Sequence, residues 1–163
     1  DGDEGPKEAK KDDRKFQNVT DEFTALRDKK KVQEDRETSE KLDTILHRGL
    51  RELREGNYFR AMAEFQFALT ISPNNGRASF YMNKTKQALD SEIEQNLIKA
   101  RRDQESLKYM SAVQSYCNIL RLLEGYGEDG RYKKAEEEIK QLENKMGLDE
   151  GEIVCANYGD GKK

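Results

Sequence analysis

The sequence predicts an all-α protein, and three observations support that prediction. Asp, Glu, Lys and Arg make up 39% of the 163 residues, whereas apolar residues make up only 34%. This composition is too polar for a thick two-sheet core, because average globular chains are ~45–50% apolar. The chain has only two Pro and 12 Gly, and long stretches contain neither, which favours helices. We therefore expect thin cores in which helices pack on helices.

The first 37 residues are predicted to lie outside the main helical domain. Residues 1–15 are almost wholly charged and cannot bury enough surface to offset the entropy of ordering, so we interpret them as a disordered lead. Residues 16–37 are predicted to be an accessory amphipathic helix and linker. Its apolar side chains follow at steps of three, four and three, the spacing of one narrow helical face: Phe16, Val19, Phe23 and Leu26. We expect this face to pack back on the main domain, as a cap or in a groove.

The main helical domain is predicted over residues 38–146, and a flexible tail over 147–163. Apolar periodicity and the Gly and Pro breaks divide the domain into helices. Neither Gly nor Pro occurs between Gly76 and Gly125, so one unusually long helix is expected there. The predicted helices cover residues 42–55, 58–71, 78–102, 107–124 and 131–146.

Residues 42–75 form a predicted helix–turn–helix unit of 34 residues, and its most informative segment is GNYFRAMAEFQFALTISPNN. The small, aromatic and proline residues of this segment fall at spacings that resemble those of the tetratricopeptide repeat (TPR), a helical hairpin of 34 residues. The resemblance implies that Gly49 lies where two helices cross closely. The predicted core positions of the repeat are Gly49, Gly56, Tyr58, Ala61, Phe65, Ala68 and Pro73.

The same spacing recurs downstream in degenerate form. Tyr109 and Ala112 repeat the positions of Tyr58 and Ala61, and Tyr132 begins a third, shorter unit. The intervals between the three tyrosines are 51 and 23 residues instead of 34. The chain is therefore expected to form a short, irregular array of TPR-like hairpins that includes one long helix.

No sequence pattern is typical of a catalytic or metal centre. The chain lacks a nucleophile elbow, a phosphate loop, and HExxH and CxxC motifs, and His47 is its only histidine. Cys117 falls on the apolar side of a predicted helix and Cys155 in the polar tail, so we expect free thiols and not a disulfide framework. Free thiols favour a reducing, cytoplasmic location. We expect no enzyme activity, no cofactor and no bound metal.

The resemblance to TPR proteins implies that the chain binds other proteins. In that family, the first helices of successive repeats line a groove that holds a peptide or a helix of a partner protein. By position, the partner-binding candidates are Leu46, His47, Leu50, Leu53, Arg54, Arg77, Phe80, Tyr81 and Lys84. The alternative for Leu46, Leu50 and Leu53 is that they belong to the core.

The predicted function is a non-catalytic adaptor or scaffold that forms part of a larger protein or complex. The chain has 33 acidic and 30 basic residues, which disfavours nucleic acid as a partner because binding it usually requires a basic excess. No window approaches the ~20 apolar residues of a membrane span. One alternative is a structural component that forms homo-oligomers through its long or C-terminal helix. Another is a regulatory part of a larger signalling protein.

Overall fold

The computed structural model describes residues 7–158, which form five α-helices and one short 3-10 helix. These elements are α1 (Lys7–Arg54), α2 (Tyr58–Ile71), α3 (Gly76–Glu105), α4 (Tyr109–Leu122), α5 (Gly130–Lys145) and the 3-10 helix η1 (Cys155–Asn157). The described residues contain no strand. The all-α prediction is therefore confirmed, and α2 has the predicted bounds.

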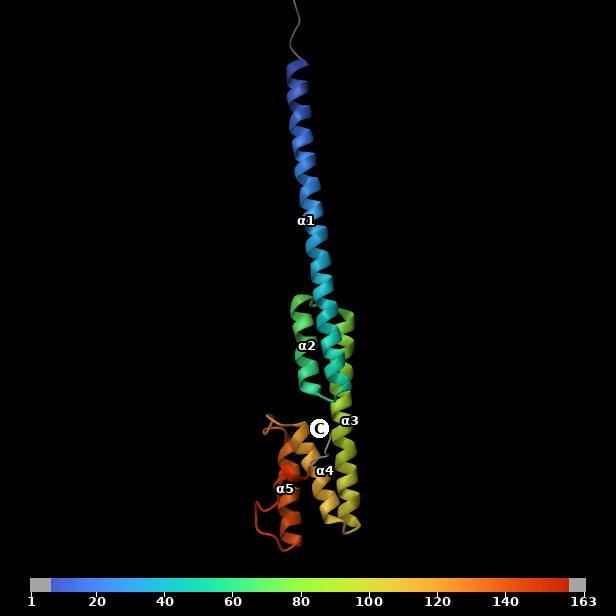
Figure 1. The fold of residues 1–163 in the computed structure, drawn as a ribbon, viewed down its shortest axis with the longest axis vertical. Helices are drawn as coiled ribbons and strands as arrows, with labels where there is room; N and C mark the ends of the chain where they lie inside the picture. The colour runs from blue at the N-terminus through green and yellow to red at the C-terminus, as the bar shows by residue number, and fades with distance from the viewer. Residues whose placement is uncertain (1–6, 159–163) are drawn as a thin grey trace, which may run out of the picture.

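The helices form two groups that are joined end to end through α3 (Figure 1). The end of α1 and all of α2 pack on the first half of α3, while α4 and α5 lie along its second half. Both groups fit along α3 because this helix has 30 residues and spans roughly 45 Å, whereas α2 and α4 have 14 residues each. Helix α4 runs back along α3, so its C-terminal end meets the N-terminal end of α2.

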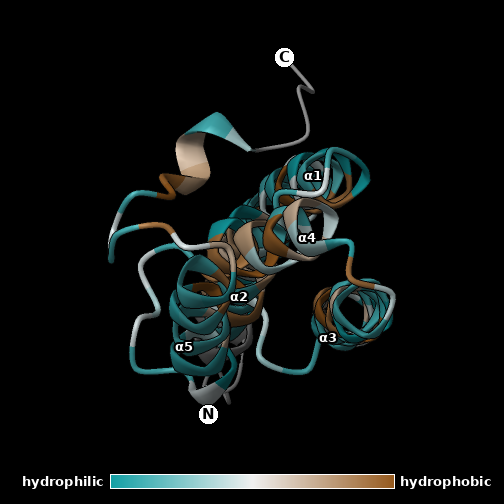
Figure 2. Ribbon diagram, turned by 90° about the horizontal axis from the view of Figure 1, so that it is seen from below, coloured by the Kyte–Doolittle hydropathy of each residue, from teal (hydrophilic) through white to brown (hydrophobic). Residues whose placement is uncertain are grey.

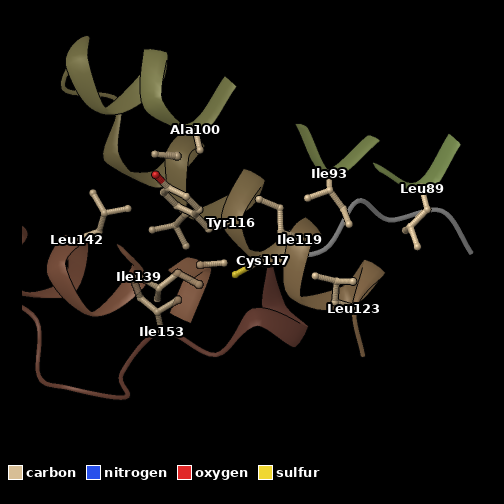
Figure 3. Packing of buried hydrophobic residues seen from close by; sticks show 13 residues of the cluster. Leu89, Ile93, Ala100, Tyr116, Cys117, Ile119, Leu123, Ile139, Leu142 and Ile153 are labelled. Atoms are coloured by element: carbon tan, nitrogen blue, oxygen red, sulfur yellow. The ribbon is translucent and has the colours of Figure 1, made fainter. Parts of the chain in front are cut away.

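Each group has its own hydrophobic core. The first core combines Ile45 and Leu46 of α1 with Phe65 of α2 and Met82 of α3. The second core lies between α3, α4 and α5 and includes Tyr116, as Figure 3 shows. Viewed along the helix axes, the hydrophobic residues of α3 turn inward, and the outer side of α5 is hydrophilic (Figure 2). The thin helix-on-helix cores expected from the composition are present.

Helices α1 and α2 cross closely at Gly49. A Cβ atom at this position would lie 2.5 Å from Cε1 of Phe65, which is far inside van der Waals contact. Phe65 itself is fully buried. Gly49 is therefore needed for the approach of the two helices, as its position in the predicted repeat implies.

The other predicted repeat positions divide between core and turn. Ala61, Phe65 and Ala68 are fully buried in α2, and Tyr58 is half-buried. Gly56 and Pro73 lie in exposed turns, where they end helices instead of filling the core.

The turns before α2 and α4 have the same geometry although their sequences differ. Gly56 and Leu107 both take a left-handed backbone, with φ angles of 78° and 62°. In each turn the next residue, Asn57 or Lys108, donates its N–H to the carbonyl oxygen five residues earlier, at 2.9 and 2.8 Å. The equivalent positions of the following helices are buried: Ala61 and Phe65 in α2, Ala112 and Tyr116 in α4. The 51-residue interval thus relates two structurally equivalent helices.

The N-terminal part differs from the prediction, because α1 is one continuous helix of 48 residues, roughly 72 Å long. Residues 7–15 belong to this helix, and residues 1–6 of the predicted lead lie outside the described residues. No separate helix over residues 16–37 exists, because neither Gly nor Pro interrupts the chain between Pro6 and Gly49.

The predicted docking of the N-terminal apolar face is wrong. Phe16, Val19, Phe23 and Leu26 have exposed fractions of 79%, 49%, 69% and 63%. A continuous helix cannot fold back on the two helix groups without a break. The α1 stripe, as we call these four side chains, therefore projects away from both cores (Figure 1).

The segment after α5 is packed and is not a flexible tail. Ile153 is buried in the second core, and its N–H donates to the buried carboxylate of Glu143 at 2.9 Å. Cys155 forms a disulfide with Cys117 of α4, with the Cα atoms 5.2 Å apart. The prediction of free thiols is therefore wrong, because α5 returns the chain along α4. Residues 159–163 of the predicted tail lie outside the described residues.

Candidate protein-binding surface

The predicted binding residues form two rows, one on α1 and one on the first half of α3. On α1, His47 and Leu50 lie three residues apart, and Asp43, four residues before His47, shares their helical face. Arg77 begins the row on α3, and its Nη1 lies 3.3 Å from the Asp43 carboxylate. This ion pair links the two rows, and we call the surface between them the α1–α3 face.

An aromatic ladder leads from the first core to this face. The ring of Phe65 stacks on Tyr81 at a centroid distance of 5.8 Å, and Tyr81 meets Phe80 edge to face at 5.2 Å. Phe80 ends the ladder with 53% of its surface exposed. The ammonium of Lys84 lies 5.6 Å from the centroid of this ring, a cation–π contact. Phe80 is thus a large exposed side chain with neighbours on its own helix that restrict its motion.

The charge of the α1–α3 face is basic. Arg77 is paired with Asp43, while His47 and Lys84 are exposed. Nδ1 of His47 lies 2.7 Å from the carbonyl oxygen of Asp43, so an N–H on this nitrogen donates to the backbone and orients the ring. The face therefore presents the Lys84 ammonium beside an exposed aromatic ring.

The structure does not bring all predicted residues to this face. Leu46 is only 1% exposed and belongs to the first core, so the core alternative is right for this residue. Leu50 and Leu53 are half-buried and pack against the same core. Leu53 and Arg54 lie further along α1 and line a separate cleft.

This cleft, of about 740 Å³, lies at the joint between the two helix groups. The end of α1 and the start of α2 form one side, and Arg121 at the end of α4 lines the other. The hydroxyl of Tyr58 donates to the carboxylate of Glu92 inside it. Burial, then the hydrogen bond and the charge of Glu92, raise the pKa of Tyr58 to about 12. A neutral tyrosine thus joins α2 to α3 here.

The cleft could not be predicted from the sequence, because its residues come from three distant segments. No local pattern relates Arg60 and Glu92 to Arg121. The one available signal was the 51-residue interval between Tyr58 and Tyr109, which exceeds the regular 34 residues. The extra residues lengthen α3 and place the end of α4 opposite the start of α2.

The described part of the chain lacks two further classes of site. Residues 7–158 contain no group of three or more His, Cys, Asp or Glu side chains that could hold a metal ion. None of the helices described is both long and apolar enough to cross a membrane.

Comparison with protein-family models, with curated proteins and with solved structures gives no match to this chain. The resemblance to TPR proteins therefore depends on the residues and contacts described above.

Proposed function

We propose that this chain is a TPR-like, non-catalytic interaction module, an adaptor or scaffold unit that binds a peptide or an amphipathic helix of a partner protein on its α1–α3 face. The observation that carries the proposal is Phe80, which is 53% exposed yet held between Tyr81 and Lys84. Aromatic side chains of restricted motion lose little entropy on binding, and they dominate the energetics of many interfaces.

The chemistry of the face suggests what the partner presents. Phe80, Tyr81 and the half-buried Leu50 offer apolar surface for one or two apolar side chains. His47 and Lys84 offer hydrogen-bond donors, and Lys84 a fixed positive charge, at the edge of that surface. We infer that the ligand is an acidic peptide or helix with apolar residues on one side.

Contacts between residues 34 positions apart support a TPR-like arrangement. Asp43 pairs with Arg77, and Tyr58 bonds to Glu92, each across an interval of 34 residues. Such contacts arise when one 34-residue hairpin stacks on the next. The array is irregular because α4 packs on the second half of α3, so the proposed groove covers only α1 and the first half of α3.

We also propose that the protein works in an oxidising compartment, in place of the cytoplasmic location expected from free thiols. The support is the disulfide between Cys117 and Cys155, which closes a sequence separation of 38 residues inside the second core. Disulfides persist mainly in secreted, lumenal and periplasmic proteins.

A display library of random peptides tests the binding proposal. We expect selection on the immobilised chain to enrich acidic peptides with spaced apolar residues. The variant Phe80→Asp should lose their binding. Ile98→Asp is the matched control, because Ile98 is also 53% exposed on α3 but belongs to the second half of that helix, outside the α1–α3 face. Failure to enrich any peptide, or equal binding by both variants, would exclude the α1–α3 face.

A further inference from the structure

The projecting part of α1 carries an apolar stripe that no other described residue covers. Every residue from 13 to 41 is exposed, and Figure 1 shows this part of α1 extending beyond both helix groups. The stripe consists of Phe16, Val19, Phe23 and Leu26, which are 49–79% exposed. Contiguous exposed apolar side chains of this size typically mark an interaction surface.

The spacing of the stripe is that of a coiled-coil seam. In the heptad abcdefg, Phe16 and Phe23 take the a positions, and Val19 and Leu26 take the d positions. The next a position is Lys30. In register, Lys30 faces its own counterpart, which costs stability, but a shifted register would bury it against apolar residues, so a single Lys at an a position favours one register over others.

The charged side chains beside this seam are opposite in sign to those that they would face on a second, identical helix. In a parallel, in-register pair, each g side chain faces the e side chain five residues later on the other helix. Glu22 then faces Arg27, and Lys29 faces Glu34. Two-fold symmetry repeats both contacts, so four pairs of opposite charge flank one short seam.

The antiparallel arrangement is less favourable. With the four apolar layers aligned, Glu22 faces its own counterpart, and Lys15 faces Lys29. Only Asp13 and Arg27 attract each other in that arrangement. Like charges opposite each other reduce the stability of a helix pair, so the charges select the parallel form.

These charged groups are available for such contacts. Within the described residues, Glu22, Arg27 and Lys29 make no ion pair, and Glu34 lies 4.0 Å from Lys30 on the same exposed helix face. A surface pair of this kind is weak and can be shared with a partner.

We propose that residues 13–34 of α1 form a parallel, in-register, two-stranded coiled coil with a second copy of this chain. The seam ends before the two helix groups, because the a and d positions that follow Lys30 and Gln33 are Glu37 and Glu40, which would repel their counterparts. The two α1 helices then diverge, which leaves room for the packed helix groups of both chains at the same end of the dimer. The dimer presents two copies of the α1–α3 face side by side, which gives avidity for a repeated or dimeric partner.

Sedimentation equilibrium of the full chain tests self-association. We expect the mass to rise from 18.9 kDa towards twice that value between about 1 μM and about 1 mM. Phe23→Lys places a charge in the seam and should weaken association at least about a hundredfold. Val32→Lys is the matched control, because Val32 is 68% exposed against 69% for Phe23 but lies off the seam. A chain that stays monomeric throughout, or equal effects of the two variants, would overturn the proposal.

Three further variants test the orientation. Glu22→Lys should weaken the dimer roughly tenfold, and adding Arg27→Glu should restore it, because the second change recreates the opposite charges. Val19→Cys should join two chains by a disulfide under mild oxidation, because d positions of parallel partners face each other. Failure of the second charge change to restore association, or absence of the Val19→Cys cross-link in a sample that is dimeric, would overturn the parallel register. A monomeric chain that instead pairs with a helix of a different protein would overturn the assignment to a second copy.

Discussion

Replacing Gly49 by Ala should destabilise the first helix group, because α1 and α2 touch at this position. The added Cβ would lie 2.5, 2.8 and 2.9 Å from three carbon atoms of the buried Phe65 ring. Ordinary carbon contacts are about 3.5–4.0 Å, so the helices must separate by about 1 Å or the ring must leave its rotamer. Overpacking of this kind costs about 1–3 kcal/mol. The better helix propensity of Ala returns about 1 kcal/mol. We expect a net loss of up to about 2 kcal/mol.

Urea unfolding monitored by circular dichroism measures this loss. Gly76→Ala is the control, because Gly76 also lies in a helix but a Cβ atom there would meet nothing within 4 Å. This variant should be neutral or slightly stabilised. Phe65→Leu removes ring atoms from the contact, so the double variant with Gly49→Ala should lose less stability than the two single changes add up to. A Gly49→Ala protein at least as stable as the parent would refute the close crossing of the two helices.

Three other predictions concern a turn, the disulfide and a tyrosine. Leu107→Gly should stabilise the protein by about 1 kcal/mol in urea unfolding, because Leu107 is 71% exposed and has a left-handed φ of 62°. A loss of stability would mean that the contacts of the Leu107 side chain stabilise the fold by more than its left-handed backbone destabilises it. Replacing Cys117 and Cys155 by Ser should lower the free energy of unfolding by roughly 4 kcal/mol, the loop-entropy value for a separation of 38 residues. A reductant should lower the stability of the parent similarly and leave the double variant unchanged, and a parent insensitive to reductant would contradict the disulfide. The pKa of Tyr58 is about 12 in the folded chain and ordinarily 10.0, so the unfolded chain releases this proton first as pH rises. Stability should therefore fall between about pH 10 and pH 12, with a smaller slope in Tyr58→Phe. An unchanged slope would contradict the raised pKa of Tyr58, which burial and then the bond to Glu92 produce.

The sequence by itself predicted the features that local spacing specifies. The bounds of α2 follow from the Gly56 turn before it and the Pro73 turn after it, and the structure has the same bounds. The resemblance to the tetratricopeptide repeat implied a close crossing at Gly49, and the structure places this residue against the ring of Phe65. The equivalence of α2 and α4 was likewise visible in the repeated Tyr and Ala spacing.

Only the tertiary structure decided where distant segments meet. The pairing of Cys117 with Cys155 depends on the return of the chain after α5, which no residue near either cysteine encodes. The cleft beside Tyr58 depends in the same way on the length of α3 and the direction of α4.

For the N-terminal helix, the apolar face was predicted correctly but its docking on the rest of the chain was not. A short amphipathic segment was expected to fold back, because isolated helices are marginal in water and apolar side chains favour burial. The structure leaves the α1 stripe exposed because an uninterrupted helix cannot bend back to the cores. Local periodicity thus specified the apolar face of the helix, whereas its surroundings were decided by the continuity of α1 and the distance of the stripe from the rest of the chain.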